Sequence, residues 1–428
     1  MRRSLPLALI ALAVPFVILA VAIAAARRDD TPAPTPTPVP PAASPAPAPA
    51  ATAVTPLSPL PAAGPGLAVG VTEYNPNLVS ADKPVPPPWS TVRDALGKLQ
   101  PAFYRLVIEW NRVQPMADQP PNLDHPETGC MREVQPCLWW GGVREQLRAL
   151  ASRQRQGGWE GLAVITGTPD WAAQPPSGCE RDSTTPRARL PRPDALAAYK
   201  ALVADVLAAA QQEGADLRFW SAWNEPNLPP FISPQRAKCD AASPSLAPAG
   251  YAQLTRTLIQ ALDEAPGDQT LVLGETAGIL KSTKLVTSVP EFIQGLPQDI
   301  VCASTVWTQH AYIGGPDPVD ETAGALDERH CPQPHTLWIT ETGVGPAPKA
   351  FSNITDRTAR CGQLHDRLVQ WFNDPRVTVA FQYTAREDDK FPTGLYSTDL
   401  TEPRPALAEW TAWGGGRAPT APPAAAAC

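Results

Sequence analysis

Short apolar runs alternate with longer amphipathic stretches between Leu67 and about Gly416. The runs are rich in Val, Ile, Leu and aromatic residues, which is typical of strands in a parallel sheet that is covered on both faces. Eight strands are predicted, at Leu67–Tyr74, Phe103–Trp110, Leu162–Thr168, Phe219–Asn224, Thr270–Gly274, Ser304–Ala311, Thr336–Thr340 and Val377–Tyr383.

Helical spacing fills several of the intervals between these runs. Helices are predicted at Val143–Gln154, Pro193–Glu213, Ala249–Glu264 and Asp356–Phe372, with weaker helical patterns after the first, fifth, sixth and eighth strands. Eight strands with intervening helices over about 350 residues indicate a (β/α)8 TIM barrel. An open doubly wound sheet is the alternative, but no G-x-G-x-x-G follows the first strand.

The N-terminal segment 1–30 differs from the rest of the chain. Arg2 and Arg3 precede an uncharged, mainly apolar run from Leu5 to Ala26. This length favours an uncleaved single-pass anchor over a signal peptide, whose apolar region is usually about 7–15 residues. The triplet Ala22-Ile23-Ala24 leaves cleavage open, so we expect the protein on the outer face of the cell membrane or secreted.

Residues 31–66 consist almost entirely of Pro, Ala, Thr, Ser and Val, and proline fills 54 of the 428 positions in the chain. Such a segment cannot bury a core and favours an extended, disordered tether of roughly 110 Å. We therefore expect one catalytic-size domain at 67–416, a disordered linker before it, and a short disordered tail at 417–428.

The charge of the chain argues against one class of partner, and its cysteine content indicates disulfides. The formal charge is −7 with no long basic run, which argues against nucleic acid as a partner. Eight cysteines in an exported chain favour disulfides. No C-x-x-C occurs and the histidines show no ligand spacing with the cysteines, so we expect no metal site. The barrel domain is expected to be monomeric.

Two predicted strands end in a glutamate. The fourth runs Phe219-Trp-Ser-Ala-Trp-Asn-Glu225-Pro-Asn, and the seventh runs Thr336-Leu-Trp-Ile-Thr-Glu341-Thr-Gly. The carboxyl ends of barrel strands meet at one mouth, so both carboxylates would face the same cavity. Paired carboxylates suit hydrolysis of a glycosidic bond, since one can donate a proton while the other attacks. Each glutamate could instead cap a loop or pair with an arginine.

The sequence Trp223-Asn-Glu-Pro-Asn227 resembles the acid/base motif of clan A glycoside hydrolases, and Ile339-Thr-Glu-Thr-Gly343 resembles the nucleophile strand of that clan. Trp220–Leu228 most resembles family 39, which includes β-xylosidases, with family 5 close behind. The resemblance implies a (β/α)8 barrel and retaining hydrolysis, with Glu225 as acid/base and Glu341 as nucleophile. It also implies that Asn224 hydrogen-bonds the sugar 2-hydroxyl.

Further positions match the same clan. Arg105 matches an arginine near the nucleophile, where it would keep Glu341 ionised; it could also be paired across the barrel floor. His310 and Tyr312 resemble a pair that borders the nucleophile, and a Tyr312 hydroxyl would lower the pKa of Glu341. His310 could equally be a core residue with satisfied hydrogen bonds.

Two positions depart from the clan pattern. The third strand ends at Thr168-Pro-Asp-Trp171, where family 5 members often have a histidine, and the eighth ends at Gln382-Tyr383, where many members have a tryptophan. Trp171 or Tyr383 could supply an aromatic face for a sugar ring, and both could be ordinary packing. The identity of the sugar therefore stays open.

The predicted barrel also narrows the disulfide pairing. Cys130 and Cys137 share the loop after the second strand, Cys179 and Cys239 lie in neighbouring loops, and Cys302 and Cys331 precede adjacent strands. We predict the pairs Cys130–Cys137, Cys179–Cys239, Cys302–Cys331 and Cys361–Cys428.

These observations predict a glycosidase that hydrolyses O-glycosidic bonds of oligo- or polysaccharides, β-xylosidase-like or β-glycanase-like, by double displacement. The two-carboxylate chemistry requires no metal or organic cofactor. The alternative is a catalytically inactive barrel that binds carbohydrate at the cell surface, and a tethered structural protein is a third hypothesis. The G-x-S-x-G pattern and the P-loop pattern are absent from the sequence, which argues against an esterase and against a nucleotide-binding protein.

Overall fold

The computed structural model describes residues 66–130, 135–344, 357–387 and 391–427. The predicted N-terminal anchor at 1–30 and the predicted linker up to residue 65 lie outside these ranges, as does Cys428. Among the helices that the described ranges contain, none combines the length and the apolar character needed to span a bilayer.

The strands form one parallel barrel. The bounds are β1 (Ala68–Thr72), β2 (Phe103–Glu109), β5 (Glu160–Thr166), β6 (Phe219–Ser221), β7 (Thr270–Leu271), β8 (Leu273–Ala277), β9 (Val306–His310), β10 (Thr336–Thr342) and β11 (Val377–Tyr383). Their order is β7-β6-β5-β2-β1-β11-β10-β9-β8. Because only Val272 separates β7 from β8, the two ends of this order belong to one interrupted strand. The predicted (β/α)8 barrel is confirmed.

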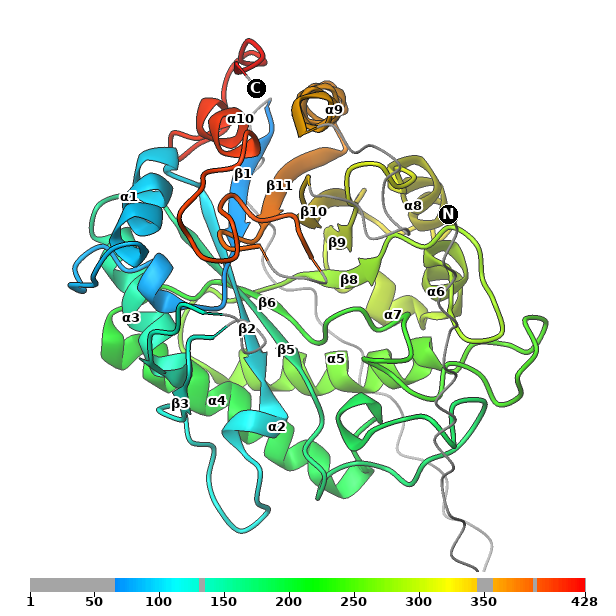
Figure 1. The fold of residues 1–428 in the computed structure, drawn as a ribbon. Coiled ribbons are helices and arrows are strands. Elements are labelled where there is room, and N and C mark those ends of the chain that lie inside the picture. Colours follow the sequence, from blue (N-terminus) through cyan, green and yellow to red (C-terminus); the bar gives the residue numbers. More distant parts are fainter. Residues whose placement is uncertain (1–65, 131–134, 345–356, 388–390, 428) are drawn as a thin grey trace, which may run out of the picture. The chain divides into compact units, whose positions relative to one another are not determined.

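Helices surround the strands (Figure 1). They are α1 (Trp89–Leu99), α3 (Gly142–Gln154), α4 (Leu196–Glu213), α5 (Ala247–Glu264), α6 (Val289–Gly295), α7 (Gln298–Val301), α8 (Val319–Asp327), α9 (Arg357–Phe372) and α10 (Ala406–Trp413). The loop after β2 adds α2 (Trp110–Val113), β3 (Pro126–Glu127) and β4 (Trp140–Gly141). Pro193–Ala195 is a 3-10 turn, so the predicted helix at 193 becomes regular from Leu196.

The barrel has two apolar layers. One lies between strands and helices, where residues such as Leu337 and Ile339 of β10 pack outward. The other fills the barrel interior, where Trp338 lies 5.0 Å from Phe103 and 5.0 Å from Phe219 between ring centroids. These aromatic rings form a floor beneath the mouth of the barrel.

Two strands depart from regular register near the mouth. The pairing of β8 with β9 shifts between Gly274 and Thr276, and the pairing of β10 with β9 shifts between Ile339 and Glu341. Alternation from the inward residues Val272 and Trp338 would aim Glu275 and Glu341 outward. The shifts act as β-bulges, which re-aim a side chain, and both glutamates contact Arg105 inside the barrel.

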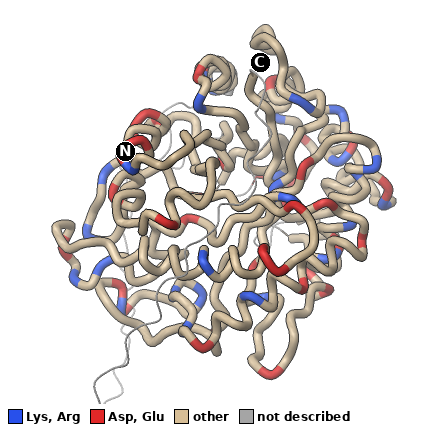
Figure 2. The backbone as a smooth tube through the Cα atoms, turned by 180° about the vertical axis from the view of Figure 1, so that it is seen from behind, with Lys and Arg blue, Asp and Glu red and all other residues tan. Residues whose placement is uncertain are grey.

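Three predicted disulfides are present: Cys130–Cys137, Cys179–Cys239 and Cys302–Cys331. Cys361 is also disulfide-bonded, and its predicted partner Cys428 lies outside the described residues. Residues 417–427 contain no helix or strand, and the Ala426 amide donates to Glu409 Oε2 at 2.9 Å. Figure 2 shows Lys and Arg interspersed with Asp and Glu along the backbone.

Candidate active site

The candidate site lies at the carboxyl ends of the barrel strands. Arg105 comes from β2, Glu225 follows β6, His310 ends β9 and Glu341 lies in β10. The site opens into a cavity of about 410 Å³ whose lining includes Asn224, Glu225 and Glu341. These residues, far apart in the sequence, therefore share one end of the barrel.

Glu225 and Glu341 converge although they lie 116 residues apart in the sequence. One carboxylate oxygen of each and a ring nitrogen of His310 all lie within 4.8 Å of one another. The Glu341 side chain is 7% exposed and that of Glu225 is 17% exposed. Glu225 has a left-handed backbone with φ 39°, which is uncommon for a residue other than glycine. Its conformation is therefore imposed by its surroundings.

Arg105 joins three of the polar groups. Its Nη1 lies 2.9 Å from Glu341 Oε1, and its Nη2 donates to Asn224 Oδ1 at 2.7 Å and to Glu275 Oε2 at 2.5 Å. The guanidinium is fully buried. Burial acts to lower the pKa of Arg105, but the carboxylates of Glu275 and Glu341 outweigh it and raise that pKa above its usual range. Arg105 is therefore a fixed cation beside Glu341.

His310 lies among three carboxylates. Its Nδ1 is 2.9 Å from Glu225 Oε1 and 3.4 Å from Glu341 Oε2, and its Nε2 is 3.3 Å from Glu275 Oε2. Burial acts to lower the pKa of His310, but Glu341, Glu225 and Glu275 together raise it to about 10. The Tyr312 hydroxyl donates to Glu341 Oε2 at 2.7 Å.

Burial is the largest influence on Glu341 and raises the pKa of its carboxyl above the usual value. The cations His310 and Arg105 and the hydrogen bond from Tyr312 act in the opposite direction, while the neighbouring carboxylate of Glu225 adds to the increase. Two cations and one hydroxyl therefore offset part of the cost of holding this carboxylate in a buried site.

Glu275 is a site residue that sequence reasoning missed. It is fully buried in β8, and it pairs with both Arg105 and His310. Burial acts to raise the pKa of Glu275, but Arg105 and His310 lower it to about 2. The available signal was a charged residue, Gly274-Glu275-Thr276, directly after an apolar run. The predicted strand ended one residue too early to include it.

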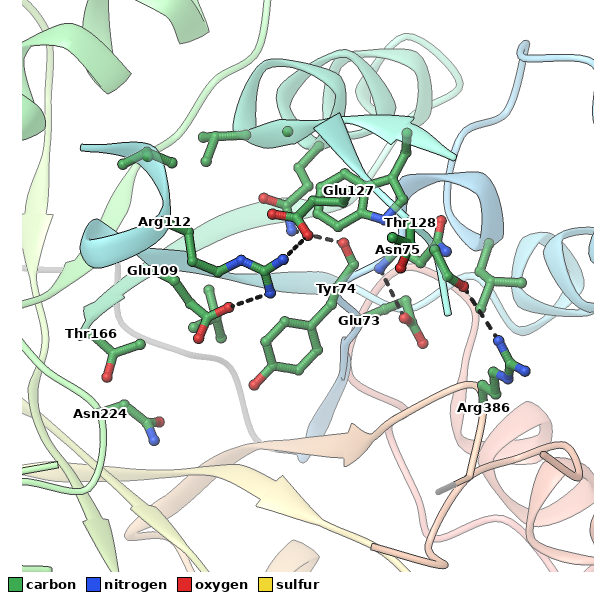
Figure 3. Close-up of a pocket in the computed structure, with 18 of the residues that line it drawn as sticks. Glu73, Tyr74, Asn75, Glu109, Arg112, Glu127, Thr128, Thr166, Asn224 and Arg386 are labelled. Carbon is green, nitrogen blue, oxygen red and sulfur yellow. Dashed lines mark hydrogen bonds and ion pairs between the residues drawn. The ribbon is translucent and has the colours of Figure 1, made fainter. Parts of the chain in front are cut away.

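A second charged group lines the cavity on the side of the β2 loop (Figure 3). Arg112 of α2 lies between Glu109 and Glu127, at 3.2 Å from Glu109 Oε2 and in contact with Glu127 Oε2. Arg187 lies 3.3 Å from Glu109 Oε1. Because the arginines and glutamates pair, this wall is polar without carrying a strong net charge.

The two predicted aromatic platforms have different places. Tyr383 lines the cavity, with its hydroxyl 3.4 Å from the hydroxyl of Tyr74. Trp171 is absent from the cavity lining that the described residues form; it packs edge-on against Trp110 and donates to the Gln114 carbonyl at 2.9 Å. The structure therefore brings Tyr383, but not Trp171, to the site, because the loop after β5 turns the indole toward α2.

The ligand atoms of Glu225, His310 and Glu341 are close enough to bind one metal ion. Each of these side chains already contacts a protein group of opposite charge or a hydrogen-bond donor. The ion pairs among them account for the arrangement.

Comparison with known proteins gives the fold. No protein-family model matches the chain, and no curated protein matches it in sequence. Solved structures that match include a GH53 catalytic domain from Ignisphaera aggregans, with TM-score 0.50, 13% identity and coverage of 82% of this chain and 97% of that chain. A GH39 β-xylosidase from Caulobacter crescentus has TM-score 0.52 and 15% identity, covering 82% of this chain and 72% of that one.

The catalytic domain of GH30 xylanase C from Talaromyces cellulolyticus also matches, with TM-score 0.51, 12% identity and coverage of 84% and 77%. At these identities the likeness establishes the fold alone. The barrel is thus similar to those of glycoside hydrolases of families 53, 39 and 30, of which family 39 is also one of the two families that the strand-end motifs resemble.

Proposed function

We propose that the protein is a retaining glycoside hydrolase that cleaves O-glycosidic bonds of oligo- or polysaccharides. The observation that carries this proposal is the pair Glu225 and Glu341, of which one carboxylate oxygen each lies within 4.8 Å of the other at an open cavity. Retaining enzymes hold their two carboxyl groups about 5–5.5 Å apart, whereas inverting enzymes leave about 6.5–9.5 Å for a water molecule. The close spacing supports the retaining arrangement.

The contacts of each glutamate support its role. Glu341 receives Arg105 on Oε1 and the Tyr312 hydroxyl on Oε2, as suits a carboxylate that must be ionised to attack. Glu225 is the more exposed of the two and contacts His310 through one oxygen, Oε1. Its second oxygen is the group we assign to proton transfer.

The reaction proceeds in two displacements. Glu341 attacks the anomeric carbon and forms a glycosyl ester, while Glu225 gives its proton to the departing oxygen. Glu225 then takes a proton from water, whose oxygen attacks the same carbon and releases Glu341. With Asn224 Oδ1 held by Arg105, the Asn224 amide N–H group would donate to the sugar 2-hydroxyl, and Tyr383 would support the sugar ring.

We place the enzyme outside the cytoplasm, either anchored by residues 1–30 or secreted. Three disulfides favour an oxidising compartment. The apolar N-terminal run and the Pro/Ala-rich segment that follows it fit export and tethering. A carbohydrate of the cell surroundings is then the accessible substrate.

Covalent trapping tests the proposal. After a panel of xylo-, gluco-, manno- and arabino-configured aryl glycosides has identified a substrate, the matching 2-deoxy-2-fluoro glycoside should label Glu341, as peptide mass spectrometry would show. The Glu341→Gln variant is the matched control and should take no label. Sugar binding without turnover on the whole panel would instead favour the inactive carbohydrate-binding barrel, and label on another residue would overturn the assignment of Glu341.

A further inference from the structure

Glu275 has a conformation that its surroundings must enforce. Its backbone is left-handed, with φ 52°, at the register shift between β8 and β9. Such conformations persist in residues other than glycine only where the structure around them over-determines them, and they gather at functional sites. Glu275 is fully buried and, within the described residues, does not line the cavity. It therefore acts on a substrate only through other groups.

The backbone of Glu275 holds the acid/base residue. Its carbonyl accepts the peptide N–H of Glu225 at 2.8 Å, and its own N–H donates to Thr308 Oγ1 at 2.6 Å. The left-handed backbone at Glu225 is thus hydrogen-bonded to the left-handed backbone at Glu275, which is hydrogen-bonded in turn to Thr308 of β9. This chain of contacts fixes where the Glu225 side chain begins.

The side chain of Glu275 holds the two cations of the site. Its Oε2 accepts from Arg105 Nε at 3.0 Å and lies 3.3 Å from His310 Nε2. The other ring nitrogen of His310, Nδ1, lies 2.9 Å from Glu225 Oε1. With a carboxylate facing each ring nitrogen, both nitrogens must carry a proton for both contacts to be hydrogen bonds.

The charged groups around His310 come from every neighbouring part of the barrel. Glu275 faces it from β8, Glu225 from the end of β6 and Glu341 from β10, while Arg105 of β2 shares the Glu275 oxygen. Without the Glu275 charge, His310 and Arg105 would lose the carboxylate oxygen that both of them contact, and Glu341 alone would remain in contact with both cations. The imidazolium would then be less favoured.

We propose that Glu275 is a positioning residue that keeps His310 as an imidazolium and holds it, with Arg105, between the two catalytic glutamates. This inference rests on the proposed function. The His310 Nδ1–H donates to Glu225 Oε1, so the acidic proton of Glu225 must sit on Oε2, the oxygen assigned to the leaving group. The two cations together favour the ionised form of Glu341.

The test is nuclear magnetic resonance of the full-length chain with ¹⁵N-labelled histidine, of which the protein has five. His310 is assigned by its absence in His310→Gln. In the wild type both ring nitrogens of His310 should be protonated at pH 8, where an ordinary histidine is neutral. Glu275→Gln keeps the shape and removes the charge, and the titration midpoint of His310 should fall by about 1–3 pH units.

Glu109→Gln is the matched control, since it removes one carboxylate charge at the mouth of the barrel from a residue that pairs with Arg112 and Arg187 and not with His310, and it should leave the His310 midpoint in place. Kinetics give a second measurement: kcat of Glu275→Gln should fall at least about tenfold with KM changed less than about twofold, because Glu275 does not line the cavity.

A neutral His310 in the wild type at pH 8 would overturn the proposal even if Glu275→Gln fails to fold, and so would an unmoved midpoint in the folded variant. Neither result depends on turnover. If the fluoro glycoside labels Glu341 while His310 does not respond, the proposed function stands and the role of Glu275 fails. If the His310 midpoint falls in Glu275→Gln and no glycoside is cleaved or trapped, the role of Glu275 stands and the proposed function fails.

Discussion

The floor and the mouth of the barrel are built by the same strands but obey different physical chemistry. On β2, Phe103 packs into the aromatic floor, and Arg105, two residues on, is a buried cation. On β10, Trp338 packs into the floor, and Glu341 three residues on is a buried carboxylate. The floor gains stability by excluding water, whereas the mouth holds costly charges that balance one another.

Along each of these strands, the residues that stabilise the fold lie at the floor and the residues that could carry chemistry lie at the mouth. A dry floor lowers the local dielectric constant beneath the charged cluster, so each ion pair above it is stronger than it would be in water. Changes in the floor should therefore reduce the free energy of unfolding, and changes at the mouth should reduce turnover in a folded protein.

Glu341→Gln should have the largest effect. Removing the proposed nucleophile should lower kcat by at least about 10⁴-fold while thermal denaturation shows a folded protein. Glu264→Gln, at an exposed ion pair with Lys200, serves as the control for loss of a carboxylate and should retain activity. A Glu341→Gln variant with near-normal turnover would show that this charged residue at the mouth does not carry the chemistry, which would contradict the comparison.

Trp338→Ala should test the floor. Emptying this buried position should lower the free energy of unfolding by about 3–5 kcal/mol, measured by urea denaturation. Trp139→Ala is the matched control, because Trp139 is 62% exposed, and its effect should stay within about 0.5 kcal/mol. Equal losses in the two variants would show that the aromatic floor has no special part in stability.

Replacing Cys302 and Cys331 with serine should act at the end of the barrel away from the site. The bond closes a loop with a sequence separation of 29, and its loss should reduce stability by about 3 kcal/mol. At temperatures where the variant stays folded, kcat should equal that of the wild type. A selective loss of kcat would mean that this end of the barrel is coupled to the mouth.

Tyr312→Phe should have the smallest effect and a distinct pH signature. Losing the hydrogen bond to ionised Glu341 should lower kcat/KM by about 10–100-fold. Since burial already raises the pKa of Glu341, wild-type activity should fall, on acidification, at a higher pH than an ordinary glutamate would give. The variant loses a contact that lowers this pKa, so its acid limb should move to still higher pH.

The pH dependence of kcat/KM, measured for both proteins in the same buffers, checks this result. An acid limb that moves to lower pH in Tyr312→Phe would contradict the assigned contact. An acid limb at the same pH in both proteins would mean that Tyr312 does not affect the ionisation of Glu341.

Much of this architecture can be predicted from the sequence because it follows from local pattern. All eight strand positions match apolar runs, and the two glutamates at strand ends could be located because barrel strands share one polar mouth. Three disulfides could be predicted because each pair of cysteines lies in one loop, in neighbouring loops or before adjacent strands of the barrel. The helices at 143–154 and 249–264 were placed to within two residues at each end.

Features that depend on backbone irregularity could not be predicted. Regular alternation aims Glu275 away from the interior, and only the register shift at this residue turns it toward Arg105. Trp171 was one of two candidates for an aromatic face at the sugar, and the loop after β5, whose path no sequence pattern describes, carries its indole against Trp110. The ion pairs of Arg112 likewise join segments whose approach no sequence pattern describes.

The most direct measurement is the anomeric configuration of the first product, followed by ¹H nuclear magnetic resonance during hydrolysis of the substrate that the panel identifies. Two close carboxylates acting in sequence predict that the sugar is released with the configuration of the bond that was cleaved, before mutarotation. Release of the opposite anomer would contradict the account, because a single displacement by water leaves no role for Glu341 as the attacking group.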